Sequence, residues 1–160
     1  MHVPTPQVNA SGLRVGLVVS RYHAEITSAL ARGARDAFAR AGGSEADLLE
    51  VASPGTFELP AICAAFANDT PVDAVVALGC VIAGETRHDR YIAGAVADGL
   101  MRIAIDTGRP VAFGVLTVGT IEQARARAGG AKGNKGAEAM VAAIEAALAI
   151  RAILDDGGER

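Results

Sequence analysis

The stretch DAVVALGCVI, residues 73–82, is an almost unbroken run of apolar side chains. A strand covered on one face alternates apolar and polar residues, so an unbroken run is typical of a strand buried on both faces. Similar runs occupy residues 13–20 (LRVGLVVS) and 110–118 (PVAFGVLTV), and residues 46–52 (ADLLEVA) form a weaker run of the same type. We therefore expect four strands in one buried sheet.

Helical periodicity fills the segments between and after these runs, with apolar residues recurring at three- and four-residue spacing. Thr120 is placed to cap one of these helices. The expected helices cover residues 26–38, 57–67, 92–103, 120–130 and 134–154. Parallel strands need a crossover connection, so this alternation predicts an α/β fold. We expect a three-layer αβα sandwich around a four-stranded parallel sheet of the flavodoxin type.

The length of 160 residues is enough for one domain with a conventional core. We place that domain at residues 13–156 and a short tail at 157–160. Residues 1–12 contain two prolines and no periodicity. They form an arm that is either disordered or adds an edge strand to a neighbouring subunit.

Composition excludes several classes of protein. A formal net charge of −3 argues against nucleic-acid binding. Cys63 and Cys80 lie far apart in apolar stretches and form no metal-ligand pattern, so we expect buried, reduced thiols. No basic, apolar leader and no membrane-length apolar run is present, which predicts a cytoplasmic protein. The apolar fraction of 51% favours self-association.

The turn after residues 73–82 has the composition of an anion site. Ligands of open parallel sheets bind outside the carboxyl ends of the strands. There Gly84 allows close approach of the backbone, Thr86 offers a hydroxyl, and the helix expected from near Asp89 offers free N–H groups. A phosphate fits this set, with His88 beside it to transfer protons. The alternative is a plain turn with Thr86 as the cap and His88 in solvent.

Other chemical groups follow the remaining strands. Tyr22 suits stacking on a flat heterocycle, or it closes the end of the sheet. Glu58 interrupts an apolar segment, where its carboxylate suits sugar-like hydroxyls or simply the dipole of a helix start. The segment GGAKGNKG, residues 129–136, lacks the P-loop pattern and is interpreted as a loop between helices. Arg127 and Lys135 are candidate anion contacts or solvated charges.

Five motifs in this order and spacing resemble the 6,7-dimethyl-8-ribityllumazine synthase family, over about residues 13–150. They are PGTFELP (54–60), GCVIAGETRH (79–88), FGVLT (113–117), EQA with RAG (122–124 and 127–129), and NKG (134–136). The resemblance implies condensation of 5-amino-6-ribitylamino-2,4(1H,3H)-pyrimidinedione with 3,4-dihydroxy-2-butanone 4-phosphate, which releases phosphate and water in riboflavin biosynthesis. It implies no cofactor and no metal.

The resemblance also implies roles for individual residues. His88 is the proton-transfer residue, Tyr22 stacks on the pyrimidine, and Glu58 holds ribityl hydroxyls. The backbone of Gly84 and Glu85, with Thr86, binds phosphate. The other substrate-binding residues implied are Thr56, Phe57, Val81, Ile82, Phe113, Arg127 and Lys135. Of these, Phe113, Arg127 and Lys135 come from the adjacent subunit, because the family shares its sites within pentamers or sixty-subunit shells. Riboflavin synthase is a candidate protein partner.

The sequence departs from the family pattern around the histidine. Asp89 stands where an aromatic is usual and Arg87 where a proline is usual, while His23 replaces a common Asn and Thr56 a smaller residue. A carboxylate at Asp89 favours a charged His88 and Arg87 opposes it, so we expect an active enzyme with a shifted pH optimum.

Three other functions stay open at the level of the sequence. The fold is also compatible with a flavin- or lumazine-binding protein without catalysis, with a purely structural shell protein, or with a riboflavin synthase of the archaeal type. Tight flavin binding without turnover would distinguish the first of these from the synthase.

Overall fold

A computed structural model describes residues 7–158 of the chain. The chain builds a four-stranded parallel sheet from β1 (Val15–Ser20), β2 (Leu48–Ser53), β3 (Ala74–Ile82) and β4 (Val111–Val118). The strands are ordered β2-β1-β3-β4, which confirms the flavodoxin-like α/β fold. Within this range no helix is both long and apolar enough to cross a membrane.

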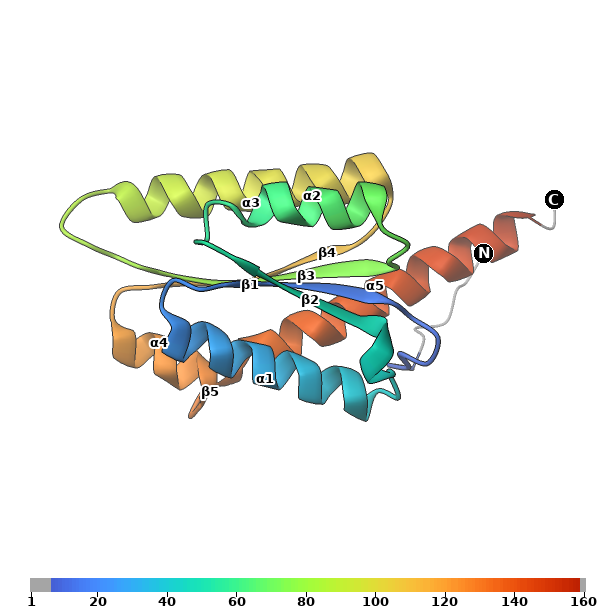
Figure 1. The fold of residues 1–160 in the computed structure, drawn as a ribbon, viewed down its shortest axis with the longest axis horizontal. Coiled ribbons are helices and arrows are strands. Elements are labelled where there is room, and N and C mark those ends of the chain that lie inside the picture. Colours follow the sequence, from blue (N-terminus) through green and yellow to red (C-terminus); the bar gives the residue numbers. More distant parts are fainter. Residues whose placement is uncertain (1–6, 159–160) are drawn as a thin grey trace.

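Helices cover both faces of the sheet, as Figure 1 shows. One layer contains α1 (Ala24–Arg40), α4 (Ile121–Arg127) and α5 (Lys135–Gly158), and the other contains α2 (Leu59–Asp69) and α3 (His88–Thr107). A 3-10 turn, η1 (Glu45–Asp47), precedes β2. The three-layer sandwich expected from the alternation of strands and helices is therefore present.

The position of β3 inside the sheet explains why its run of apolar residues is uninterrupted. Val76 and Leu78 belong to the core cluster under α1 and α5, whereas Val75 and Ala77 belong to the cluster under α2 and α3. Successive side chains of a strand point to opposite faces, and here both faces are covered. The expectation of a strand buried on both sides is confirmed for β3.

The expectation that β2 is a strand of the same buried type is wrong. β2 pairs only with β1, so it lies at the edge of the sheet. Glu50, Val51 and Ala52 are exposed there. Its weaker apolar pattern, with Glu50 in the middle, reflects that edge position.

Two local features decide where α4 and α5 begin. The Thr120 hydroxyl accepts a hydrogen bond from the Gln123 backbone N–H at 3.2 Å, so the predicted cap of α4 is confirmed. The segment expected to be a plain loop instead forms a small antiparallel hairpin, β5 (Ala128–Gly130) and β6 (Gly133–Asn134). Its turn depends on Gly129 and Gly133, whose φ angles are 104° and 76°.

Candidate active site

A cavity of about 640 Å³ opens at the carboxyl edge of the sheet. Its wall comes from the turns after β1 and β2, the end of β3 and the first turns of α3. Most of the predicted site residues line it: Tyr22, Thr56, Phe57, Glu58, Val81, Ile82, Gly84, Thr86 and His88. The sequence pattern therefore identified which residues converge, although they come from four separate segments.

One end of this first cavity is aromatic and open. The side chains of Tyr22 and Phe57 are 66% and 59% exposed. The ring of Tyr22 meets that of His23 at 4.8 Å between centroids, with an angle of 74° between their planes. Large apolar side chains left this open at a concave surface are typical of a site that covers a flat ligand.

The turn after β2 presents a carboxylate and a buried hydroxyl. Glu58 is the exposed residue immediately before α2, so its carboxylate lies at the positive end of that helix. The hydroxyl of Ser53 donates to the Gly55 carbonyl at 2.7 Å and holds the turn. Thr56 is only 6% exposed, and its hydroxyl has no hydrogen-bond partner among the described residues. A buried hydroxyl in this condition is able to accept or donate to a ligand.

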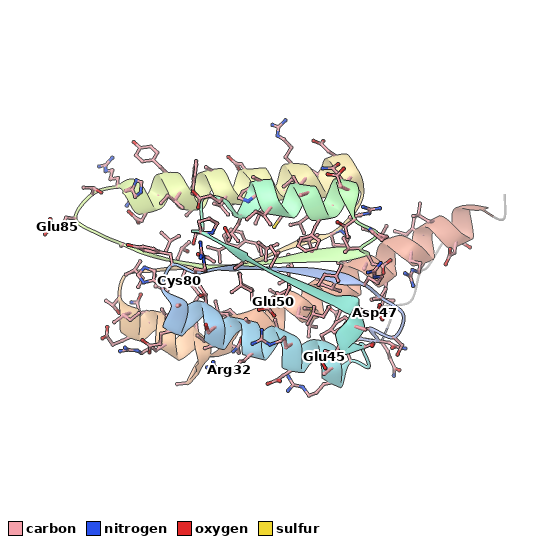
Figure 2. The ribbon with its side chains drawn as sticks, in the orientation of Figure 1. Arg32, Glu45, Asp47, Glu50, Cys80 and Glu85 are labelled. Carbon is pink, nitrogen blue, oxygen red and sulfur yellow. The ribbon has the colours of Figure 1, made fainter. Side chains whose placement is uncertain are left out.

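The loop from β3 to α3 forms the other end of the cavity and projects from the body of the molecule (Figure 1). A Cβ added at Gly84 would meet nothing within 4 Å, so the fold itself does not demand glycine there. The backbone N–H of His88 donates to the Thr86 hydroxyl at 3.4 Å, and both side chains are exposed. Glu85 does not line the cavity, and in Figure 2 it points outward from the tip of the loop.

A second cavity, of about 470 Å³, is lined by three further predicted residues, Phe113, Arg127 and Lys135. It lies between β4 and the start of α5, and no described residue lines both cavities. The chain by itself therefore does not bring these three residues to Tyr22 and His88.

The two cations of the second cavity are held by local contacts. The Arg127 guanidinium donates to the Gln123 carbonyl at 3.2 Å. Lys135 pairs with Glu138 at 2.7 Å. Asn134 fixes the start of α5, because its side-chain oxygen accepts from the backbone N–H groups of Gly136 and Ala137. The NKG motif thus contains a structural residue, Asn134, and a cation that lines the second cavity, Lys135.

The sequence did not single out every residue of the two cavities as a site residue. The first is also lined by His23, Gly55, Cys80, Asp89 and Ile92, and the second by Glu138. Glu138 was detectable as a residue three positions after Lys135 on one helix. Burial raises the pKa of the Cys80 thiol to about 11, so it stays protonated at neutral pH.

The described residues contain no group of three or more His, Cys, Asp or Glu side chains placed to hold a metal ion. What the first cavity does offer is an aromatic face, a carboxylate, an imidazole and a helix N-terminus at the ligand-binding edge of a parallel sheet. This combination defines an α/β enzyme whose site suits a flat, polyhydroxylated ligand and an anion.

Comparison with known proteins identifies the family. The family model described as 6,7-dimethyl-8-ribityllumazine synthase matches residues 12–151. The chain is 48% identical over 149 residues to the 6,7-dimethyl-8-ribityllumazine synthase of Thermus thermophilus, covering 93% of this chain and 95% of that protein. The protein of the same name from an Anaeromyxobacter species is 47% identical over 151 residues, covering 94% and 93%. The chain belongs to the 6,7-dimethyl-8-ribityllumazine synthase family.

Proposed function

We propose that the protein condenses 5-amino-6-ribitylamino-2,4(1H,3H)-pyrimidinedione with 3,4-dihydroxy-2-butanone 4-phosphate to give 6,7-dimethyl-8-ribityllumazine. The observation that carries this proposal is the content of the first cavity. This cavity combines a surface for a heterocycle, a carboxylate for a hydroxylated chain and a donor-rich loop for a phosphate. The chain that forms it belongs to the lumazine synthase family.

The pyrimidine occupies the aromatic end of the cavity. Its ring stacks on Tyr22, and Val81 and Ile82 supply an apolar wall. The ribityl hydroxyls lie along the turn after β2, where Glu58 accepts their hydrogen bonds and the unpaired Thr56 hydroxyl gains a partner. Phe57 covers this part of the ligand with its exposed ring.

The butanone phosphate occupies the end nearest α3. The N–H groups of Gly84 and Glu85, the Thr86 hydroxyl and the N-terminus of a 20-residue helix are the donors that a phosphate requires. The Glu85 side chain points away in Figure 2, so its contribution comes from the backbone. His88, in the first turn of α3, is within the same cavity.

A neighbouring subunit completes the site. The second cavity holds an aromatic and two cations, which are the groups that the first cavity lacks around its phosphate end. We propose a closed ring of five chains in which Phe113, Arg127 and Lys135 of one subunit face Tyr22 and His88 of the next. A shell of such rings is compatible with the same contact.

The reaction follows from these positions. The pyrimidine amine attacks the ketone carbon, and loss of water gives an imine. Elimination then releases the phosphate, after which tautomerisation and attack of the second amine on the remaining carbonyl close the ring, again with loss of water. His88 moves protons between these steps, and Arg127 balances the charge of the departing phosphate. Much of the acceleration comes from holding both substrates in one orientation.

The proposal is tested by mixing the purified protein with both substrates and following lumazine absorbance and phosphate release together. Both signals should appear in equal amounts. His88→Ala is expected to lower kcat about 100-fold or more because general acid–base catalysis is removed. Binding of the pyrimidine without either signal would contradict a synthase and favour a ligand-binding protein without catalysis.

Sharing of the site is tested by subunit mixing. His88→Ala and Arg127→Ala are each expected to be nearly inactive when assembled alone. When they are unfolded together and reassembled, about one quarter of the interfaces in a randomly mixed ring pair an intact first cavity with an intact second one. Activity should therefore return to about one quarter of the wild-type value. Mixed rings without activity would show that each chain uses its own Arg127.

A further inference from the structure

His23 has a backbone conformation that is uncommon for a residue other than glycine. His23 lies at the turn from β1 to α1 with φ 56° and ψ 51°, in the left-handed region. It is the single non-glycine residue with positive φ among residues 7–158. Gly adopts this backbone most easily, and Asn, Asp and His tolerate it better than other residues, so the backbone by itself does not select histidine over Gly or Asn.

Hydrogen bonding does not select histidine either. The His23 backbone carbonyl accepts from the N–H groups of Ile26 at 2.9 Å and Thr27 at 3.1 Å, and any residue offers that carbonyl. The imidazole makes no capping hydrogen bond to α1. An Asn at this position would fit the backbone and would also offer a capping oxygen.

What the imidazole does contact is Tyr22. The two rings meet nearly at right angles, with their centroids 4.8 Å apart, and both line the first cavity. Tyr22 is 66% exposed, so few other contacts restrict rotation of its ring. An edge-to-face neighbour selects one ring orientation from those that an exposed tyrosine would sample.

We propose that His23 is a positioning residue for the heterocyclic substrate: its imidazole holds the ring of Tyr22 in the orientation that stacks on the pyrimidine. This role rests on the proposed function of the first cavity. Because the ordering of Tyr22 occurs before the ligand arrives, the ligand binds more tightly than to a freely rotating ring. The butanone phosphate, at the other end of the cavity, gains nothing from this contact.

The test is His23→Asn, which removes the ring and suits the left-handed backbone. The KM for the pyrimidine should rise about two- to tenfold, the range expected for one aromatic pair. The KM for the butanone phosphate should stay the same, and the thermal midpoint should not fall. In a Tyr22→Leu background the same substitution should have no further effect on the pyrimidine, since the ring that His23 orients is absent.

Three results would overturn the proposal. The first is an unchanged pyrimidine KM in His23→Asn, and the second is an equal rise of both KM values. The third is an equal rise of the pyrimidine KM when His23→Asn is made in the Tyr22→Leu background. His23→Phe, which keeps a ring, should restore part of the affinity. If that variant does not fold, the double-mutant comparison decides alone. Equilibrium binding of the pyrimidine gives the same comparison without turnover, so failure of the synthase assay would not be confused with failure of this proposal.

Discussion

At the scale of single residues, the buried hydroxyl of Thr56 lets its effect on stability be measured apart from its proposed part in binding. Its hydroxyl is buried beside the sheet and has no partner within the described part of the chain. A Cβ added at Gly79 would lie 2.8 Å from this oxygen, so Gly79 leaves just enough room for Thr56 against β3. A buried hydroxyl without a partner costs about 1–3 kcal/mol.

Thr56→Val is therefore expected to raise the free energy of unfolding by about 1 kcal/mol, because it replaces the hydroxyl by a methyl group of similar shape. The same change should weaken pyrimidine binding if Thr56 contacts the ribityl chain. Urea denaturation measures the first effect and the KM for the pyrimidine the second. A less stable variant would mean that the hydroxyl has a partner in the folded protein.

The two buried thiols predict a loss of stability at alkaline pH. Burial raises the pKa of Cys63 to about 12 and that of Cys80 to about 11, from an ordinary value of 9.0. Above pH 9.0 the unfolded chain therefore loses protons that the native chain retains. The contribution of the two thiols to the free energy of unfolding is therefore complete below pH 9.0 and declines as the pH rises toward 11 and 12.

The measurement compares urea denaturation of the wild type with that of a Cys63→Ala, Cys80→Ala variant at about pH 8 and about pH 10. The variant starts less stable, but it should lose less stability between the two conditions. All other groups are common to both proteins, so their effects cancel in the comparison. Equal losses would show that the thiols do not contribute.

At the scale of elements, α5 packs against α1 without space for a side chain at the contact. A Cβ added at Gly136 would overlap the carbonyl group of Leu30. Gly136→Ala is therefore expected to lower the free energy of unfolding by about 1–3 kcal/mol, which is the usual effect of overpacking. Because the backbone of α1 is the obstacle, the strain cannot be relieved by rotation of a side chain.

Gly157 provides the matched control on the same helix. A Cβ there would meet nothing within 4 Å, so Gly157→Ala should be neutral or raise stability by up to about 1 kcal/mol through helix propensity. Urea denaturation of both variants checks the pair. Equal effects would mean that Gly136 acts through helix propensity and not through contact with α1.

The elements differed in how well the sequence predicted them. β3 was predictable because burial on both faces leaves an unbroken apolar run. The edge position of β2 was predictable only in part: Glu50 weakens its apolar run, but the choice of pairing partners is set by the three-dimensional order of the strands. The β5–β6 hairpin was not predictable because its strands have three and two residues, which is too few to show a periodic pattern.

At the scale of the whole molecule, all the predicted site residues except Glu85 divide between two cavities that share no lining residue among those described. Most of the first set was predictable because its members follow strands whose carboxyl ends must lie at one edge. Val81 and Ile82, which lie in β3 itself, were implied by the family resemblance. The relation between Phe113 and Tyr22 was not predictable from periodicity or spacing. Their proposed meeting across two chains comes from the family resemblance alone.

The proposal that two chains complete each site predicts that activity depends on protein concentration. Dilution below the dissociation constant of the ring should lower the activity per mole of protein, because isolated chains contain half-sites. Enzyme assays over a dilution series, alongside analytical ultracentrifugation, check this. An inert carrier protein controls for adsorption. Undiminished specific activity in samples that contain only single chains would contradict the shared site.

The length of α5 has a practical consequence. The helix starts at Lys135, beside the second cavity, and runs for 24 residues, or about 36 Å, toward the opposite end of the molecule (Figure 1). Its last turns extend past the sheet, where Ile153 and Leu154 are 51% and 68% exposed. A fluorophore or a fused domain attached beyond α5 would thus be carried far from both cavities. A group attached beyond α5 is therefore not expected to obstruct either of the two cavities.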